Sequence, residues 1–393
     1  MTNLKVSIII PVYNEEQILS LCLDSLMKLN YPKELLEIII IDNNSRDSSA
    51  SIIKKYPVKY MFEAQKGRSI ARNTAIKAAS GEIIAFTDAD CIVGKQWLKS
   101  LVRGFTAKNI GCCGGRILSY KPANWIEQSF YWLQKNQYKS LEYSDSENYF
   151  TEPLFATCNL ACRREVIDKI GLFDTTFEAG EDTDFLWRAN LAGFQLKHVR
   201  DAVVFHKHRD KIQQLPEVFW GYMYWQFWLI QKYKNIIGLS FNWFKITKDV
   251  FFNIIYSFLG LFKKPKGLPI YYIFKSIFSL MGILAGIYGA IEIAAGKGKK
   301  FPELIFKPLK TLWRWDKDGN VKMIDLDKQL YYHLSGIGAQ IWELYIANKS
   351  EEDIFAAISV KEVNCDTIEL KNNINILFAE FLNEGIFPNS TEA

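Results

Sequence analysis

The stretch GEIIAFTDAD, residues 81–90, decides the fold. An apolar run leads into a polar end that carries Asp88 and Asp90, one residue apart. A short, continuous apolar run closed by polar residues is typical of a strand that is buried on both faces of a parallel sheet. Where the strand breaks into a loop, both carboxylates can turn toward one point.

Three earlier stretches repeat this pattern. VSIIIPVYN (6–14), LEIIIIDNNS (36–45) and KYMFEA (59–64) are predicted strands, each followed by polar residues. EEQILSLCLDSLMKLNYP (15–32) and GRSIARNTAIKAAS (67–80) lie between them, with apolar residues at helical spacing. Strands alternating with helices predict an α/β domain built on a doubly wound, mostly parallel sheet. Its ligands should bind at the carboxyl ends of the strands, where the polar clusters occur.

The polar clusters PVYNEE, IDNNSRD, QKGRSIARN and TDAD, in this order, resemble the family 2 glycosyltransferases. The resemblance covers about Val6 to His208 and implies the GT-A nucleotide-sugar-binding fold. It implies that PxYNE and the aspartate after the second strand hold the base and ribose of a nucleotide-sugar donor, expected to be UDP-linked. The residues assigned to donor binding on this basis are Pro11, Tyr13, Glu15, Asp42, Lys66, Arg72 and Asp88.

The DxD element of that family falls on Asp88 and Asp90. The resemblance implies that these carboxylates anchor Mn²⁺ or Mg²⁺, a hard cation that neutralises the diphosphate leaving group. VVFHKHRD (203–210) is predicted to end an edge strand, and its His206 is the candidate third metal ligand because imidazole suits Mn²⁺. The alternative is that His206 and His208 both face a phosphate or a headgroup.

The stretch from Ala156 to Phe194 resembles the acceptor-binding half of the same family, and its EDTDF supplies Glu181 and Asp182. The family assigns its catalytic base to this aspartate, so Asp182 is expected to deprotonate the acceptor hydroxyl in one inverting displacement, with Glu181 orienting the acceptor. Trp187 and Arg188 are candidates to line the sugar pocket; a packed tryptophan and a surface arginine are the alternatives. The chain lacks the QxxRW motif of processive members, which indicates transfer of a single sugar.

Residues 1–210 are thus the expected glycosyltransferase domain, and 211–300 differ in composition. VFWGYMYWQFWLIQKYK (218–234) is rich in Trp and Tyr, residues that favour a membrane–water interface. DVFFNIIYSFLGLF (249–262) is short for a membrane span, and SIFSLMGILAGIYGAIEIAAG (276–296) reaches that length only by including Glu292. Lysines flank both sides of the second run, so helices that lie in the interface or form a re-entrant hairpin compete with a crossing. We expect the protein to be located on the cytoplasmic side of the cell membrane.

Residues 301–393 carry 9 basic and 15 acidic residues, whereas the first 300 residues carry 39 and 28. LWRWDKDGNVKMIDLDKQLYYHLS (312–335) predicts strands around a DKDGN turn, and helical patterns follow it. This resembles the PqqD-like family of small α+β, winged-helix-type domains that bind the leader segment of a peptide being modified. A domain used only for packing or dimerisation is the alternative. The acidic balance argues against a nucleic-acid partner.

The seven cysteines are odd in number and lack zinc-site spacing, so reduced thiols are expected. The N-terminal segment does not have the pattern of a secretion signal. The sequence predicts a membrane-associated, metal-dependent glycosyltransferase that modifies a ribosomally made peptide. Two alternatives stay open: transfer to a polyprenyl-phosphate or other lipid acceptor in envelope polysaccharide synthesis, and a non-catalytic scaffold that binds peptides or nucleotides.

Overall fold

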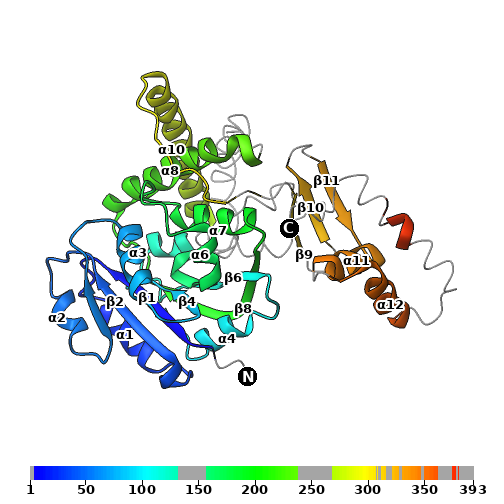
Figure 1. The fold of residues 1–393 in the computed structure, drawn as a ribbon. Helices are drawn as coiled ribbons and strands as arrows, with labels where there is room; N and C mark the ends of the chain where they lie inside the picture. Colours follow the sequence, from blue (N-terminus) through cyan, green and yellow to red (C-terminus); the bar gives the residue numbers. More distant parts are fainter. Residues whose placement is uncertain are drawn as a thin grey trace. The chain divides into compact units, whose positions relative to one another are not determined.

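The computed structural model describes residues 4–131, 156–237, 268–306 and, between residues 308 and 379, the segments 308, 311–315, 321–326, 330–346, 349–361, 374–377 and 379. These residues form two compact units that divide between Pro308 and Leu309 (Figure 1). The run 249–262, the DKDGN turn and Cys365 lie outside the described residues. Each unit is described by itself.

One half of the eight-stranded sheet in the first unit is parallel. Its strands, in spatial order, are β3 (Lys59–Phe62), β2 (Leu36–Asp42), β1 (Val6–Val12) and β4 (Ile83–Phe86). The intervening helices are α1 (Leu19–Met27), α2 (Ser49–Ile53) and α3 (Arg68–Ala78), with the short 3-10 helix η1 at Lys33–Leu35. All four strands pair in parallel. The predicted strand–helix alternation is confirmed here.

The other half of the sheet is mixed. It continues from β4 with β7 (Leu160–Arg163), β6 (Ile110–Ser119), β8 (Gln195–His206) and β5 (Cys91–Val93). Only β6 and β8 pair in parallel in this half. The prediction of a mostly parallel sheet therefore holds for the first half of the sheet and not for the second. The prediction of an edge strand before His206 was wrong. The edge is β5, which has three residues and was too short to recognise from sequence.

Helices cover both faces of this sheet. Along β1, Val6, Ile8 and Ile10 enter one apolar core, whereas Ile9 enters the other, as the two-residue period of a strand requires. The first core also contains side chains of α1 and α4 (Trp97–Arg103). The second contains side chains of α3, α6 (Arg164–Ile170) and α7 (Glu181–Leu191). Burial on both faces explains why β1 and β2 are continuous isoleucine runs rather than alternating ones.

Two long helices complete the first unit: α8 (Leu215–Ile237), which follows the short η4 at Ile212–Gln214, and α10 (Leu268–Ala294). They lie against each other (Figure 1), and Tyr224 of α8 donates a hydrogen bond to Glu292 of α10 at 2.7 Å. Within the described residues, no helix combines the length and the apolar character that a membrane crossing requires. The aromatic residues of α8 are largely packing residues, since Trp225, Trp228 and Tyr233 are buried.

The second unit contains a three-stranded antiparallel sheet in the order β11 (Leu330–Leu334), β10 (Val321–Asp325) and β9 (Thr311–Trp315). The helices α11 (Ile337–Ile346) and α12 (Glu351–Lys361) follow. Trp313 and Trp342 meet edge to face in its core, with ring centroids 5.4 Å apart. Strands and helices occur where the sequence predicts them, and the assignment to the PqqD-like family stays a prediction.

Candidate active site

Asp88 and Asp90 lie on the link between β4 and β5. The amide of Cys91 donates to the carbonyl of Asp88 at 3.1 Å, which closes a tight turn directly after the strand. Cys91 also pairs with His206 across β5 and β8. This register brings Nε2 of His206 to 3.3 Å from Oδ2 of Asp90. Asp90 and His206, two of the three residues predicted as metal ligands, are therefore neighbours in the structure although they are 116 positions apart in the chain.

The side chains around Asp90 fit a divalent cation. One ligand atom each from Asp90, Cys91 and His206 lies within 4.8 Å of the others. Burial raises the pKa of the Cys91 thiol well above its ordinary value, and sulfur is a softer ligand than a hard divalent cation prefers. The carboxylate oxygen and imidazole nitrogen that remain are ligands that suit Mn²⁺. Asp90 and His206, with the neighbouring Asp88, would hold the ion.

His208 supports His206 rather than facing a ligand. Its Nδ1 lies 3.0 Å from Nδ1 of His206, and its Nε2 lies 2.9 Å from the hydroxyl of Ser119. The ring also stacks on Phe130, with centroids 4.9 Å apart. Burial, followed by the charge of His206, lowers the pKa of His208 to about 3, so this imidazole is neutral. A neutral ring can fix the orientation of a neighbouring ligand.

Arg72 joins the two halves of the site. Its guanidinium donates to Oδ1 of Asp88 at 2.8 Å and to Oε1 of Glu181 at 2.7 Å. Arg72 and Glu181 are each only 2% exposed. Both of these nitrogens bind carboxylates of the protein, and the assignment of Arg72 to donor binding stays a prediction. Arg72 connects the DxD element with the helix that carries the expected base.

Asp182 lies in the first turn of α7, after Gly180, which has the left-handed φ of 79° that favours glycine. Its Oδ1 accepts from the Thr183 amide at 2.8 Å, and its Oδ2 accepts from the Thr157 amide at 3.4 Å. The side chain is half-buried. Burial, followed by the charge of Glu181, raises the pKa of Asp182 to about 6. A carboxylate with this pKa is ionised at neutral pH and is still basic enough to take a proton.

Tyr13 and Lys66 meet at the exposed rim of the predicted donor site. Nζ of Lys66 donates to the hydroxyl of Tyr13 at 2.7 Å, and Tyr13 is 42% exposed. Glu15 lies on the side of the aspartate pair. Burial, followed by the charges of Asp90 and Asp88, raises the pKa of Glu15 to about 7. The assignment of these three residues to donor binding stays a prediction.

Pro11 and Asp42 have internal roles. Pairing between β1 and β4 ends at Ile9, two residues before Pro11. Because proline has no N–H, its place beyond this pairing costs no hydrogen bond to β4. Asp42 is 2% exposed, and its carboxylate accepts from the Ser45 amide at 2.9 Å and the Tyr60 hydroxyl at 3.2 Å. The assignment of Asp42 to the base or ribose stays a prediction.

Sequence reasoning missed Asn43. Its Oδ1 accepts from the Gly67 amide at 2.9 Å, and its Nδ2 donates to the carbonyl of Gln65 at 2.7 Å. These bonds hold the loop that presents Lys66. The signal in the sequence was the pair Asn43 and Asn44 directly after β2. An asparagine that is buried there must find partners for its amide group, and loop backbone groups are the nearest ones.

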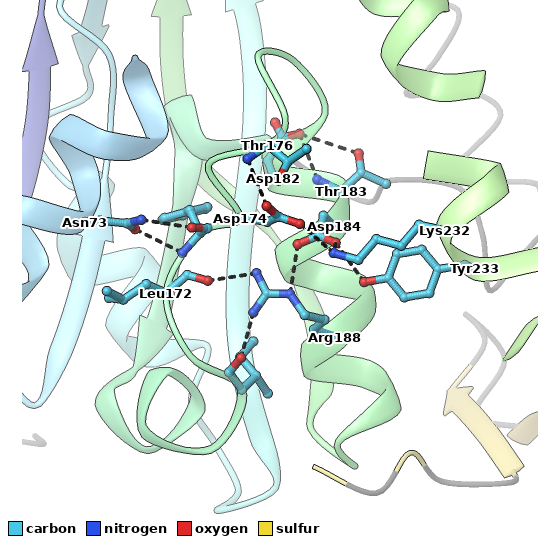
Figure 2. A network of polar contacts seen from close by, with 12 residues as sticks. Asn73, Leu172, Asp174, Thr176, Asp182, Thr183, Asp184, Arg188, Lys232 and Tyr233 are labelled. Carbon is cyan, nitrogen blue, oxygen red and sulfur yellow. Dashed lines mark hydrogen bonds and ion pairs between the residues drawn. The ribbon is translucent and has the colours of Figure 1, made fainter. Parts of the chain in front are cut away.

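The sequence left two readings open for Trp187 and Arg188: that both line the sugar pocket, or that the tryptophan is packed and the arginine lies on the surface. The structure agrees with the second reading for Trp187 only. Trp187 is a packed residue that meets Tyr233 edge to face, with centroids 5.2 Å apart. Arg188 is neither in a pocket nor on the surface. It is buried and binds Asp184 at 2.8 Å, with further bonds to the carbonyls of Ile170 and Leu172 (Figure 2).

The known proteins that this chain is similar to are glycosyltransferases. Residues 7–171 match the model described as glycosyl transferase family 2. Glycosyltransferase AglE of Haloferax volcanii is 29% identical over 221 residues, which are 54% of this chain and 70% of that protein. The pre-mycofactocin glycosyltransferase of Mycobacterium tuberculosis is 27% identical over 216 residues, 53% of this chain and 44% of that protein. A solved mannosyltransferase of Pyrobaculum calidifontis, in complex with GDP-Man and Mn²⁺, aligns with a TM-score of 0.46 at 20% identity, covering 76% of this chain and 77% of that one.

We expect Arg72→Met to lower the free energy of unfolding by about 3–5 kcal/mol, because it leaves two carboxylates without their buried cation. Arg68→Met is the matched control. Arg68 lies one turn earlier on α3, is half-exposed, and its Nε is 4.0 Å from the same Glu181 oxygen, so the loss should be below about 1 kcal/mol. Urea denaturation of both variants measures the difference. Equal losses would contradict the bridging role of Arg72.

Proposed function

We propose that this chain is a metal-dependent, inverting glycosyltransferase that moves one sugar from a nucleotide-sugar donor, and the premise is that residues 7–171 form a family 2 glycosyltransferase domain. One observation carries the proposal. The guanidinium of Arg72 binds the carboxylates of both Asp88 and Glu181. Asp88 is next to the other candidate metal ligands, and Glu181 is next to the candidate base. Donor and acceptor chemistry would therefore meet at this point.

The residues suggest a single displacement. Asp182 would take the proton from the acceptor hydroxyl as the acceptor oxygen attacks the anomeric carbon of the sugar. The bond between that carbon and the diphosphate breaks, and the diphosphate leaves with the electron pair. When bound by Asp90, His206 and Asp88, a divalent cation would neutralise the charge that collects on this leaving group. Glu181 is held by Arg72 and would orient the acceptor.

A peptide acceptor is the first candidate, and the second unit supports it. In its sheet, β10 is central and both β9 and β11 are outer strands. An extended leader peptide could add a strand to such an edge, with main-chain hydrogen bonds giving affinity and side-chain pockets giving selectivity. Recruitment there would raise the effective concentration of the acceptor at Asp182 without changing the chemistry.

A lipid acceptor at the cytoplasmic face of the cell membrane is the second candidate, and α10 favours it. Large apolar side chains of this helix recur at helical spacing and are 44–59% exposed; they are Ile277, Leu280, Leu284, Ile287, Tyr288 and Ile291. We call this set the α10 stripe. Exposed Lys297 and Lys300 follow the helix. An apolar face next to lysines is suited to an anionic membrane surface without any crossing.

Asp90→Ala should abolish metal-dependent nucleotide binding, because it removes the carboxylate that faces His206. The measurement is calorimetric titration of UDP in Mn²⁺, and then in EDTA, where wild-type binding should also be lost. Asp201→Ala, an exposed aspartate on β8, is the control and should bind as wild type does. Unchanged UDP affinity in Asp90→Ala would remove the metal assignment.

Asp182→Asn should leave UDP affinity near that of wild type and lower kcat by about two or more orders of magnitude, the usual contribution of a positioned base. Since the pKa of Asp182 is raised to about 6, the carboxylate becomes protonated below that pH. Wild-type kcat should accordingly fall as pH decreases through about 6. If Asp182→Asn retains full activity, Glu181 becomes the candidate base; if wild type itself never releases UDP from any sugar donor, a binding scaffold is the better account.

Two variants separate the acceptor classes. A chain ending at Pro308 should lose apparent affinity for a precursor peptide encoded nearby if the acceptor is a peptide. The double variant Ile287→Asp/Ile291→Asp should lose binding to anionic vesicles, and transfer to polyprenyl phosphate, if it is a lipid. Both variants should keep hydrolysis of the nucleotide sugar, which uses neither surface. A variant that keeps its acceptor affinity eliminates the corresponding class.

A further inference from the structure

Lys232 of α8 is a buried cation outside the matched family 2 region. Its side chain is only 7% exposed, and Nζ lies 2.8 Å from Oδ2 of Asp174 and 2.6 Å from Oδ1 of Asp184 (Figure 2). A lysine is rarely buried to this extent unless it is paired, and here it is paired twice. The sequence suggested a membrane-facing aromatic segment at this point, and nothing local in it indicates an ion pair.

The two partners of Lys232 lie on either side of the expected catalytic carboxylates. Asp174 belongs to the loop that leads into α7, and it also accepts from the amide of Thr176 at 2.9 Å. Asp184 lies in the first turn of α7. Glu181 and Asp182 stand between these two points in the chain. One ammonium group therefore fixes the segment that carries Asp182 both before and after it.

The surroundings of Lys232 make this clamp rigid. Asp184 also accepts from Nε of Arg188 at 2.8 Å and from the hydroxyl of Tyr233 at 2.8 Å, so two cations balance two carboxylates. The ammonium lies 5.2 Å from the ring centroid of Phe177, which in turn packs against Trp225 of α8. Burial opposes ionisation, but Arg188 and Lys232 hold the pKa of Asp184 below its ordinary value. A buried, fully paired cluster of this kind specifies one geometry.

We infer that Lys232 is a positioning residue of the transferase site, which sets the place of Asp182 by joining α8 to both sides of the segment 174–184. The inference rests on the proposed function. Misplacement of a catalytic group by about 1 Å can cost about 100-fold in rate. Lys232→Met should therefore lower kcat for UDP release from a UDP-sugar by about 10- to 100-fold. The donor KM should stay as in wild type, because the donor residues lie elsewhere.

The pH profile separates positioning from plain stabilisation. The charged or titratable groups that act on Asp182 are Glu181 of α7, Arg72 of α3 and Tyr222 of α8. Without Lys232, Asp174 and Asp184 keep only one buried cation, Arg188. Their excess negative charge favours protonated Asp182, so the acid limb of kcat should move to higher pH. Lys232→Arg should restore part of kcat and the wild-type limb.

The double variant Lys232→Met/Asp174→Asn balances the charges again without restoring the clamp. The acid limb of its kcat–pH profile should return toward the wild-type position, whereas kcat itself should stay below the wild-type value. Lys234→Met, an exposed lysine of the same helix, is the control and should match wild type. A folded Lys232→Met protein with kcat within twofold of wild type and an unmoved acid limb would overturn the inference.

Two further measurements keep the test decisive. If Lys232→Met does not fold, Tyr233→Phe removes only the hydroxyl bond to Asp184 and should lower kcat about two- to fivefold; unchanged kcat would overturn the inference. If wild type releases no UDP from any sugar donor, the proposed function fails. Hydrogen exchange then decides, since the amides of Thr183 and Asp184 should exchange faster in Lys232→Met than in Lys234→Met. Equal exchange would overturn the clamp.

Discussion

The buried guanidinium of Arg72 is the interaction on which the candidate site depends. Two carboxylates with no cation between them would repel each other in a low-dielectric interior, and neither would be stable in its ionised form. Arg72 supplies the cation between Asp88 and Glu181 and fixes both side chains by two bonds below 3 Å. The loop after β4 and the helix α7 are thereby held in one geometry.

The same principle recurs on the other side of α7. Its first turn contains three acids, a composition that the positive end of a helix favours. Arg72 neutralises Glu181, Lys232 and Arg188 neutralise Asp184, and Asp182 between them has no ion pair within the described residues. Burial, followed by the charge of Glu181, raises the pKa of Asp182 to about 6. The pattern of pairing thus singles out the carboxylate that is suited to accept a proton.

Much of this fold was predictable because its signals are local. The isoleucine runs of β1 and β2, the polar end of β4 and the glycine before α3 each identify an element without knowledge of its partners. The contacts that organise the site are not local. Arg72 and Glu181 are 109 positions apart, and Lys232 is 48 positions from Asp184. No periodicity in α3 or α8 predicts such pairs.

The stereochemistry of the first product tests the account most directly. Proton NMR should follow a UDP-α-sugar incubated with the full-length protein and Mn²⁺, with water as the acceptor, before the released sugar equilibrates. A single displacement assisted by Asp182 predicts that the β-anomer forms first. First formation of the α-anomer, or no turnover with any donor, would contradict the account.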